Sequence, residues 1–276
     1  MYTKQKRRFF TAVLFLLGMA ASYAQQDLFD SSATRRYVRF LMESKDYQTA
    51  LAEWERLYYM QAHNDTLALK ILQTYQLAGA YDRGVARFQR LYPRLSQAPR
   101  PQARAYLALL RRDGQLDSAY QVARQYPFAP RYGQKQQLSL LLLRARYQEA
   151  QSLPARQKIK DPALLSLVDR SAAIPRKSPF LSGLLSGLVP GLGKVYTGQW
   201  KDGLFSLVFV GANAFGAYRG FTKRGAQSAL GWIAAGIGTA FYAGNIYGSV
   251  KAAQQYNNRQ EEAYHRDVES YLRTLD

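Results

Sequence analysis

The sequence contains no cysteine and only two histidines among its 276 residues. The absence of cysteine excludes disulfides, cysteine-based zinc sites, thiol catalysis and a lipid-modified N-terminal cysteine. His63 and His265 have no acid or serine partner at a recognisable spacing, and Glu261 and Glu262 are adjacent, so they cannot face each other across a site. The sequence also shows no phosphate-binding loop, nucleophile elbow or metal-ligand cluster. We therefore expect no enzymatic activity, no cofactor and no metal.

Acidic residues are scarce, because 19 Asp and Glu stand against 38 Lys and Arg, which gives a formal net charge of +19. Such an excess indicates an acidic partner, and nucleic acid and anionic lipid are the usual candidates. The cations are mostly arginines spread along helical segments, without a run of five like charges. Together with the export pattern described next, this distribution favours anionic lipid or an acidic protein over nucleic acid. No small-molecule substrate is evident.

Residues 1–24 have the pattern of a secretory signal peptide. Cations at positions 4 to 8 precede an apolar run from Phe9 to Ala21, which is short for a membrane span. Small residues at Ser22 and Ala24 predict cleavage after Ala24, and an uncleaved signal anchor is the alternative. We expect the protein in the bacterial inner membrane, with residues 25–153 in the periplasm.

A pattern of about 34 residues repeats within residues 25–153. Its marker is an aromatic residue or Leu, and the spacings are 34, 35 and 31 positions from Tyr47 to Tyr81, Leu116 and Tyr147. A small residue follows each marker by three positions, an apolar stretch precedes each copy, and prolines lie between copies. This pattern predicts pairs of helices in which the small residue lets the second helix approach the first. The small residues are Ala50, Gly84, Ala119 and Ala150.

The period and the small position resemble the tetratricopeptide repeat family over about residues 31–153, although most other consensus residues of that family are missing. The resemblance implies an all-α solenoid with a concave protein-binding surface and no chemistry of its own. An irregular helical bundle is the alternative. Arginines of the first helices would line the partner surface, and the candidates are Arg35, Arg39, Arg104 and Arg111.

A basic, proline-containing linker at 154–179 leads into a glycine-rich region at 180–250. Residues 203–218 and 226–250 carry no formal charge and predict a hairpin of two transmembrane helices.

The segment 180–196 is shorter and contains Pro190, so it predicts an interfacial or re-entrant helix, with a third span as the alternative. Residues 251–276 follow as a C-terminal helix, because Tyr264, Val268, Tyr271 and Leu275 recur at helical spacing.

Small residues recur at every fourth position in two parts of the glycine-rich region. In a membrane such a stripe lets two helix backbones approach closely. The predicted packing positions are Gly183, Gly187, Gly191, Gly236, Ala240, Gly244 and Gly248.

The block from Pro190 to Gly198 has the spacing Pro-Gly-x-Gly-x-x-Tyr-x-Gly. It resembles the signature of small bacterial two-helix membrane domains, and the resemblance extends over residues 179–257. It implies no defined activity, apart from a loose association with envelope biogenesis or membrane-protein insertion. The residues that carry it are Pro190, Gly191, Gly193, Tyr196, Gly198, Gly203, Asn245 and Tyr247.

These features predict a non-enzymatic, membrane-anchored scaffold or adaptor of the bacterial cell envelope that binds protein partners through its repeats. The alternative is a subunit of a transport or membrane-protein insertion machine in which the repeats are regulatory. Charges inside the predicted spans would favour the alternative, and the spans carry none.

Overall fold

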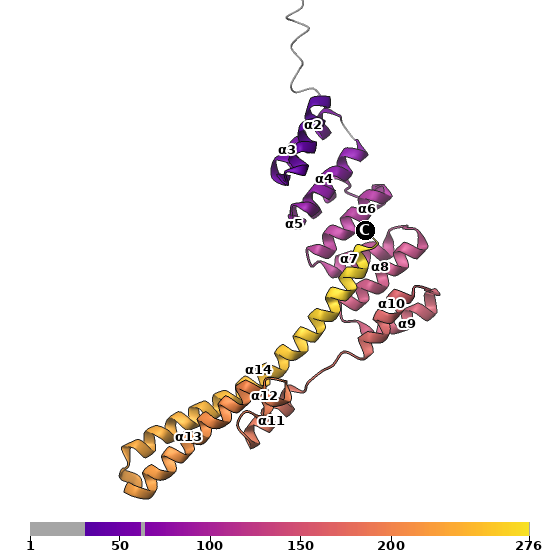
Figure 1. Cartoon of the computed structure of the whole chain (residues 1–276). Coiled ribbons are helices and arrows are strands. Elements are labelled where there is room, and N and C mark those ends of the chain that lie inside the picture. The colour runs from indigo at the N-terminus through magenta and orange to yellow at the C-terminus, as the bar shows by residue number, and fades with distance from the viewer. Residues whose placement is uncertain (1–30, 62–63, 276) are drawn as a thin grey trace, which may run out of the picture. The chain divides into compact units, whose positions relative to one another are not determined.

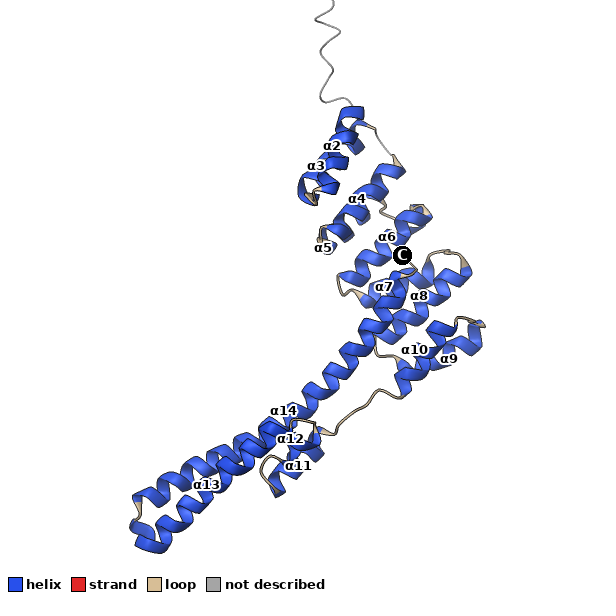
Figure 2. Cartoon of the chain, in the orientation of Figure 1, coloured by secondary structure: helices blue, strands red, loops and turns tan. Residues whose placement is uncertain are grey.

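The computed structural model describes residues 31–61 and 64–275, and within these ranges every regular element is helical (Figures 1 and 2). The predicted all-α class is therefore confirmed. The predicted signal peptide, residues 1–24, lies outside the described residues. The chain divides into two compact units, an N-terminal unit up to Leu140 and a C-terminal unit from Leu141.

The N-terminal unit is a succession of packed helices (Figure 1). From α2 to α7 each α-helix contacts the next along the chain, and α4 also contacts α6. This sequential pairing is consistent with the predicted helical repeat. The helices are α2 (Ser31–Glu43), α3 (Tyr47–Met60), α4 (Asp65–Leu77), α5 (Tyr81–Leu91), the 3-10 helix η1 (Leu95–Gln97), α6 (Arg100–Arg112), α7 (Leu116–Gln125) and α8 (Pro130–Leu143), which crosses the boundary between the units.

The turns that precede the four repeat markers share one backbone conformation. Lys45, Gly79, Gly114 and Ala145 all have positive φ, between 54° and 78°. In each case the next residue donates its N–H to the carbonyl five positions earlier, as Ala80 does to Tyr75 at 3.1 Å. This is the Schellman arrangement, which satisfies carbonyls at the end of the first helix. The sequence period of about 34 residues therefore marks a recurring helix C-terminus as well as a recurring contact between two helices.

The small residue that follows each marker is buried at the meeting point of two helices. Ala50, Ala119 and Ala150 are fully buried. A Cβ atom at Gly84 would lie 2.7 Å from Leu109 Cδ2 and 2.9 Å from Tyr75 Cβ, so a larger residue would push the helices apart.

We predict that Gly79→Ala lowers the free energy of unfolding by about 1 kcal/mol, because a left-handed conformation costs a residue with a Cβ atom about that much. The new Cβ would meet no atom within 4 Å, so backbone strain is its only cost. Conversely, Ala145→Gly should not destabilise the fold, since it removes the same strain. Chemical denaturation of the full chain measures both.

Gly211→Ala is the matched control, because its Cβ also meets open space but its φ is helical. A loss of stability at Gly211 as large as that at Gly79, or no loss at Gly79, would contradict the account of the turns.

The C-terminal unit contains a helical hairpin and a very long last helix (Figure 1). Helices α13 and α14 form the hairpin, and the 45-residue α14 also contacts α11, α12 and α10. It passes through residue 250 without a break, so the C-terminal helix predicted at 251–276 is the end of α14. The elements are α9 (Tyr147–Gln157), α10 (Pro162–Ala172), α11 (Pro179–Leu188), α12 (Leu192–Tyr196), α13 (Trp200–Arg224), the 3-10 helix η2 (Gly225–Gln227) and α14 (Ala229–Arg273).

The two membrane spans predicted at 203–218 and 226–250 are not supported. Among the described residues, none of the helices combines the length and the apolar character that a membrane crossing requires. Both segments lack formal charges, but their many glycines, tyrosines and asparagines lower the mean hydropathy. In addition, α13 carries charged residues near both ends. The segment predicted as one interfacial or re-entrant helix at 180–196 is instead two helices, α11 and α12.

The end of α14 is held against α9 and α10 by tyrosine hydroxyl groups. Val268 and Leu272, from the same part of α14, are fully buried. Burial raises the pKa of Tyr264 to about 12, and burial followed by the bonded carboxylates raises the pKa of Tyr147 and Tyr271. The hydrogen bonds run from Tyr147 to Glu261 Oε1 (3.0 Å), from Tyr264 to the Leu167 carbonyl (2.9 Å) and from Tyr271 to Asp161 Oδ2 (2.9 Å).

We predict that this contact weakens at high pH. The fold raises the tyrosine pKa above the ordinary value of about 10, so the neutral hydroxyl is the form that folding favours. The resulting stability is complete below pH of about 10 and is lost as the pH rises towards the folded pKa of about 12. The melting temperature of the full chain should fall as the pH rises through this range. In the Tyr264→Phe variant this fall should be smaller, because one of the three titrating hydroxyl groups is absent.

Tyr247→Phe serves as the control, because Tyr247 is an exposed residue of the same helix. A melting temperature that stays constant through this range in the unsubstituted chain would contradict the role given to the three hydroxyl groups.

Candidate functional site

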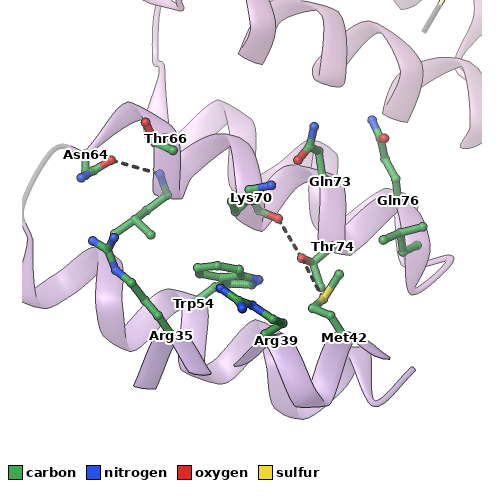
Figure 3. A pocket seen from close by; sticks show the side chains of 12 residues that line it. Arg35, Arg39, Met42, Trp54, Asn64, Thr66, Lys70, Gln73, Thr74 and Gln76 are labelled. Carbon is green, nitrogen blue, oxygen red and sulfur yellow. Dashed lines mark hydrogen bonds between the residues drawn. The ribbon is translucent and has the colours of Figure 1, made fainter. Parts of the chain in front are cut away.

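A groove lies between α2 and α4 in the N-terminal unit, with a volume of about 800 Å³ (Figure 3). Figure 3 shows the side chains of α2 opposite the row of polar side chains from α4. The groove is lined by Arg35, Arg39, Met42, Trp54, Asn64, Thr66, Leu67, Lys70, Gln73, Thr74, Gln76 and Leu77.

A second cavity of about 340 Å³ lies between α4 and α6 and adds Arg100 and Arg104 to the lining. The two cavities share Gln73 and Gln76, so they are adjacent along α4. Together they follow the first helices of three successive repeats. We call the combined surface the repeat groove.

Helical spacing places the cations of the repeat groove on one face. Arg35 and Arg39 are four residues apart on α2, as are Arg100 and Arg104 on α6, and residues four apart share a helix face. The buried residues of α2 are Thr34, Val38 and Leu41, which adjoin the face that carries the arginines. On α2 the arginines are therefore exposed and line the groove, while Val38 and Leu41 pack in the core.

The polar groups of the groove differ in how far they are already satisfied. Thr74 donates its hydroxyl to the Lys70 carbonyl at 2.8 Å, and Asn64 Oδ1 accepts the N–H of Leu67 at 3.2 Å, which caps α4. In contrast, the Nε1 atom of Trp54 is buried and has no hydrogen-bond partner among the described residues. The indole thus supplies an apolar wall with an unused donor.

The repeat groove is strongly positive. Arg35, Arg39, Lys70, Arg100 and Arg104 line it, and none of the described lining residues is Asp or Glu. Arg35 Nη2 donates to Gln61 Oε1 at 3.0 Å, and the guanidinium of Arg104 lies 4.3 Å from the centre of the Tyr132 ring. Within the described ranges, no carboxylate forms a salt bridge with any of these five cations, so their charge is available to a ligand.

Three of the four arginines predicted for a partner surface line the repeat groove, namely Arg35, Arg39 and Arg104. Arg111 does not line the groove, because α8 covers it. Arg111 is only 8% exposed, and its Nη1 atom donates a hydrogen bond to Gln136 Oε1 of α8 at 3.3 Å. The sequence reading missed Trp54, Lys70 and Arg100. Lys70 shares a face of α4 with Gln73, a helical spacing that could have indicated it.

The predicted glycine stripe only partly coincides with helix contacts. A Cβ atom at Gly183 would lie 2.8 Å from Val250 of α14, and one at Gly187 would lie 3.9 Å from Ile246, so these residues of α11 face α14. By contrast, a Cβ atom at Gly236 or Gly244 would meet nothing within 4 Å, and one at Gly248 would meet only the Lys194 side chain.

The contact of α14 with α13 uses another set of residues. Gly220 and Gly231 meet so closely that a Cβ atom on Gly220 would lie 2.7 Å from Gly231 Cα, and a Cβ atom on Gly238 would lie 3.2 Å from Asn213 Cβ. The inward face of α14 follows a seven-residue spacing, as in coiled coils. A search at every fourth position misses it. Its members are Gly231, Gly238, Asn245 and Ala252.

The glycines of the signature block are required by backbone contacts. A Cβ atom at Gly191 would lie 2.0 Å from the Gly203 carbonyl oxygen, and one at Gly193 would lie 1.9 Å from that of Ser182. Gly198 has a φ of 85°, which favours glycine. These residues therefore allow α11, α12 and α13 to meet.

The other signature residues have different surroundings. The Tyr196 hydroxyl accepts the Ser178 N–H at 3.3 Å, Pro190 lies in the turn between α11 and α12, and Tyr247 is exposed. Asn245 is only 5% exposed, yet neither its Oδ1 nor its Nδ2 atom has a hydrogen-bond partner in the described part of the chain. An unpaired buried amide of this kind costs about 1–3 kcal/mol.

The described residues contain no group of three or more His, Asp or Glu side chains that could hold a metal ion. The repeat groove presents cations, amides and apolar surface, which are the chemical groups of a binding site.

Comparisons with protein-family models, with curated proteins and with solved structures each gave no match, so no family is identified for this chain.

Proposed function

We propose that this protein is a non-enzymatic scaffold or adaptor of the bacterial cell envelope that binds an acidic segment of a partner protein in the repeat groove. The observation that carries the proposal is the row of five cations along α2, α4 and α6, none of which forms a salt bridge with a described carboxylate. Carboxylates of a partner would pair with them by charge-assisted hydrogen bonds, which are among the stronger polar contacts in proteins.

The remaining lining residues suit a polypeptide. The amides of Gln73 and Gln76 offer donors and acceptors for a peptide backbone, while Met42, Trp54 and Leu77 offer apolar surface for its side chains. An extended chain advances about 3.3 Å per residue, so about six residues would span the roughly 20 Å between the outer two of three helices at about 10 Å spacing. The expected ligand is therefore a short extended segment that combines acidic and apolar residues.

The placement in the envelope rests on the sequence of residues 1–24, and the tetratricopeptide-like period supports a protein-binding role.

We predict that a random library of about ten-residue peptides, selected on the purified full chain, becomes enriched in Asp and Glu together with apolar residues. The double variant Arg35→Ala/Arg39→Ala should bind the selected peptides roughly tenfold more weakly, since each lost ion pair contributes up to about 1 kcal/mol. Binding should also weaken as salt is added, because exposed charges are screened. Fluorescence anisotropy with labelled peptides measures each effect.

Arg90→Ala/Arg124→Ala is the matched control, because it removes the same charge from exposed positions at the ends of α5 and α7, outside the repeat groove. Selected peptides without acidic enrichment, or an equal loss of affinity in the two double variants, would show that net charge and not the groove attracts the ligand.

A further inference from the structure

A further cavity, separate from the repeat groove, lies in the C-terminal unit between α12, α13 and α14. Its volume is about 410 Å³, which falls in the range of about 300–1,000 Å³ that is typical of small-molecule sites. Its wall is formed chiefly by Lys194, Phe205, Ser206, Phe209, Phe241 and Asn245. Ala240 and Gly244, two residues of the predicted stripe, complete it on the side of α14.

One part of the cavity holds a cation without a counterion. Lys194 Nζ donates to Ser206 Oγ at 3.0 Å, and that hydroxyl donates in turn to the Asp202 carbonyl at 2.8 Å. An ammonium group has three N–H donors, so two remain for a ligand. Among the described residues, no carboxylate lies within salt-bridge distance of Lys194.

The unpaired amide of Asn245 belongs to the same cavity. Its side chain is buried, and both of its polar atoms have no hydrogen-bond partner in the described ranges. The amide is able to donate two hydrogen bonds to an anion. A cation and an unsatisfied amide on one cavity wall are a combination that packing alone does not require.

The rest of the cavity is aromatic and opens onto apolar surface. The rings of Phe209 and Phe241 have centroids 4.1 Å apart, and those of Phe205 and Phe209 are 5.9 Å apart. Phe205 is 65% exposed and Phe241 is 48% exposed, so the aromatic wall continues onto the outer face of the hairpin. The neighbouring Val208 of α13 is exposed as well.

We infer that this cavity binds the head of an anionic amphiphile, a carboxylate or phosphate that carries an acyl chain. The anionic oxygens contact Lys194 and Asn245, and the chain lies against Phe205, Phe209 and Phe241. A free small anion would leave the aromatic wall in water, and a neutral amphiphile would leave Lys194 without a counterion. The amphiphile is either a free acyl acid or a lipid of a bilayer.

The test is equilibrium dialysis of the full chain against labelled dodecanoate, dodecyl phosphate, dodecanol and inorganic phosphate, each below its micelle concentration. The two anionic amphiphiles should bind at least about tenfold more tightly than dodecanol or phosphate, since they alone satisfy both halves of the site. Flotation with vesicles of phosphatidylglycerol or of phosphatidylcholine, with and without competing dodecanoate, separates the two sources. Recovery on the anionic vesicles alone identifies a bilayer lipid, whereas dodecanoate binding without vesicle recovery identifies a free acyl acid.

Gly244→Leu should abolish the binding of dodecanoate, because the new side chain enters the cavity without meeting any other atom of the chain at its Cβ. Gly236→Leu is the matched control, since its Cβ also meets open space on the same helix and Gly236 does not line the cavity. Lys194→Met should weaken dodecanoate binding at least about tenfold and leave dodecanol binding unchanged.

Asn245→Leu separates binding from structure. It should raise the melting temperature of the ligand-free chain, because it removes an unpaired buried amide, and at the same time weaken the binding of dodecanoate. Equal binding of dodecanol and dodecanoate, binding of inorganic phosphate as tight as that of dodecyl phosphate, or dodecanoate binding that survives both Gly244→Leu and Lys194→Met would overturn the inference. Circular dichroism confirms that each variant is folded.

Discussion

Close approach of helices at positions where only a hydrogen atom or a methyl group fits is the constraint on which both units depend. With no cysteine for a disulfide, the fold depends on helix packing and hydrogen bonds. In the N-terminal unit the approach occurs at Ala50, Gly84 and Ala119, and in the C-terminal unit at Ala150, Gly191, Gly193 and Gly220. Interiors packed in this way tolerate little added volume, so these positions fix the spacing of the helices and with it the shape of each cavity.

The same packing explains why charges remain free. Each first helix of the N-terminal unit buries apolar residues and leaves at least one cation exposed, and five of these exposed cations line the repeat groove. In the C-terminal unit the tight contact of α12 with α11 and α13 carries Lys194 into an aromatic cavity. Both sites therefore offer positive charge from a rigid helical frame, which suits anionic ligands of two different sizes.

Features that repeat along the sequence, such as the helix pairs, could be predicted from it. Predictions failed where the role of a residue depends on contacts with segments distant in the sequence or on a hydropathy that charge alone does not give. The spacing of Tyr47, Tyr81, Leu116 and Tyr147 located the helix pairs, but the left-handed residue before each marker is Lys45 or Ala145 as often as glycine, so composition could not reveal it. Three of the four candidate arginines line the repeat groove. Arg111 does not, because its burial depends on α8, which is distant in sequence. The predicted membrane spans are not supported, because a segment without charge is not necessarily apolar. The contact face of α14 follows a seven-residue spacing, whereas the prediction assumed a spacing of four.

The central claim is that the repeat groove holds an acidic segment, and a photo-crosslinking residue at Gln73 tests it most directly because Gln73 lines both parts of the groove. The variant would be expressed in its native cells, irradiated, and the attached peptides sequenced by mass spectrometry, with the same residue at Arg90 as the reference position. The account predicts that Gln73 captures a segment rich in Asp and Glu that Arg90 does not capture, and that Arg39→Ala reduces its yield. Capture at Gln73 of segments without acidic residues, or of the same peptides as at Arg90, would contradict it.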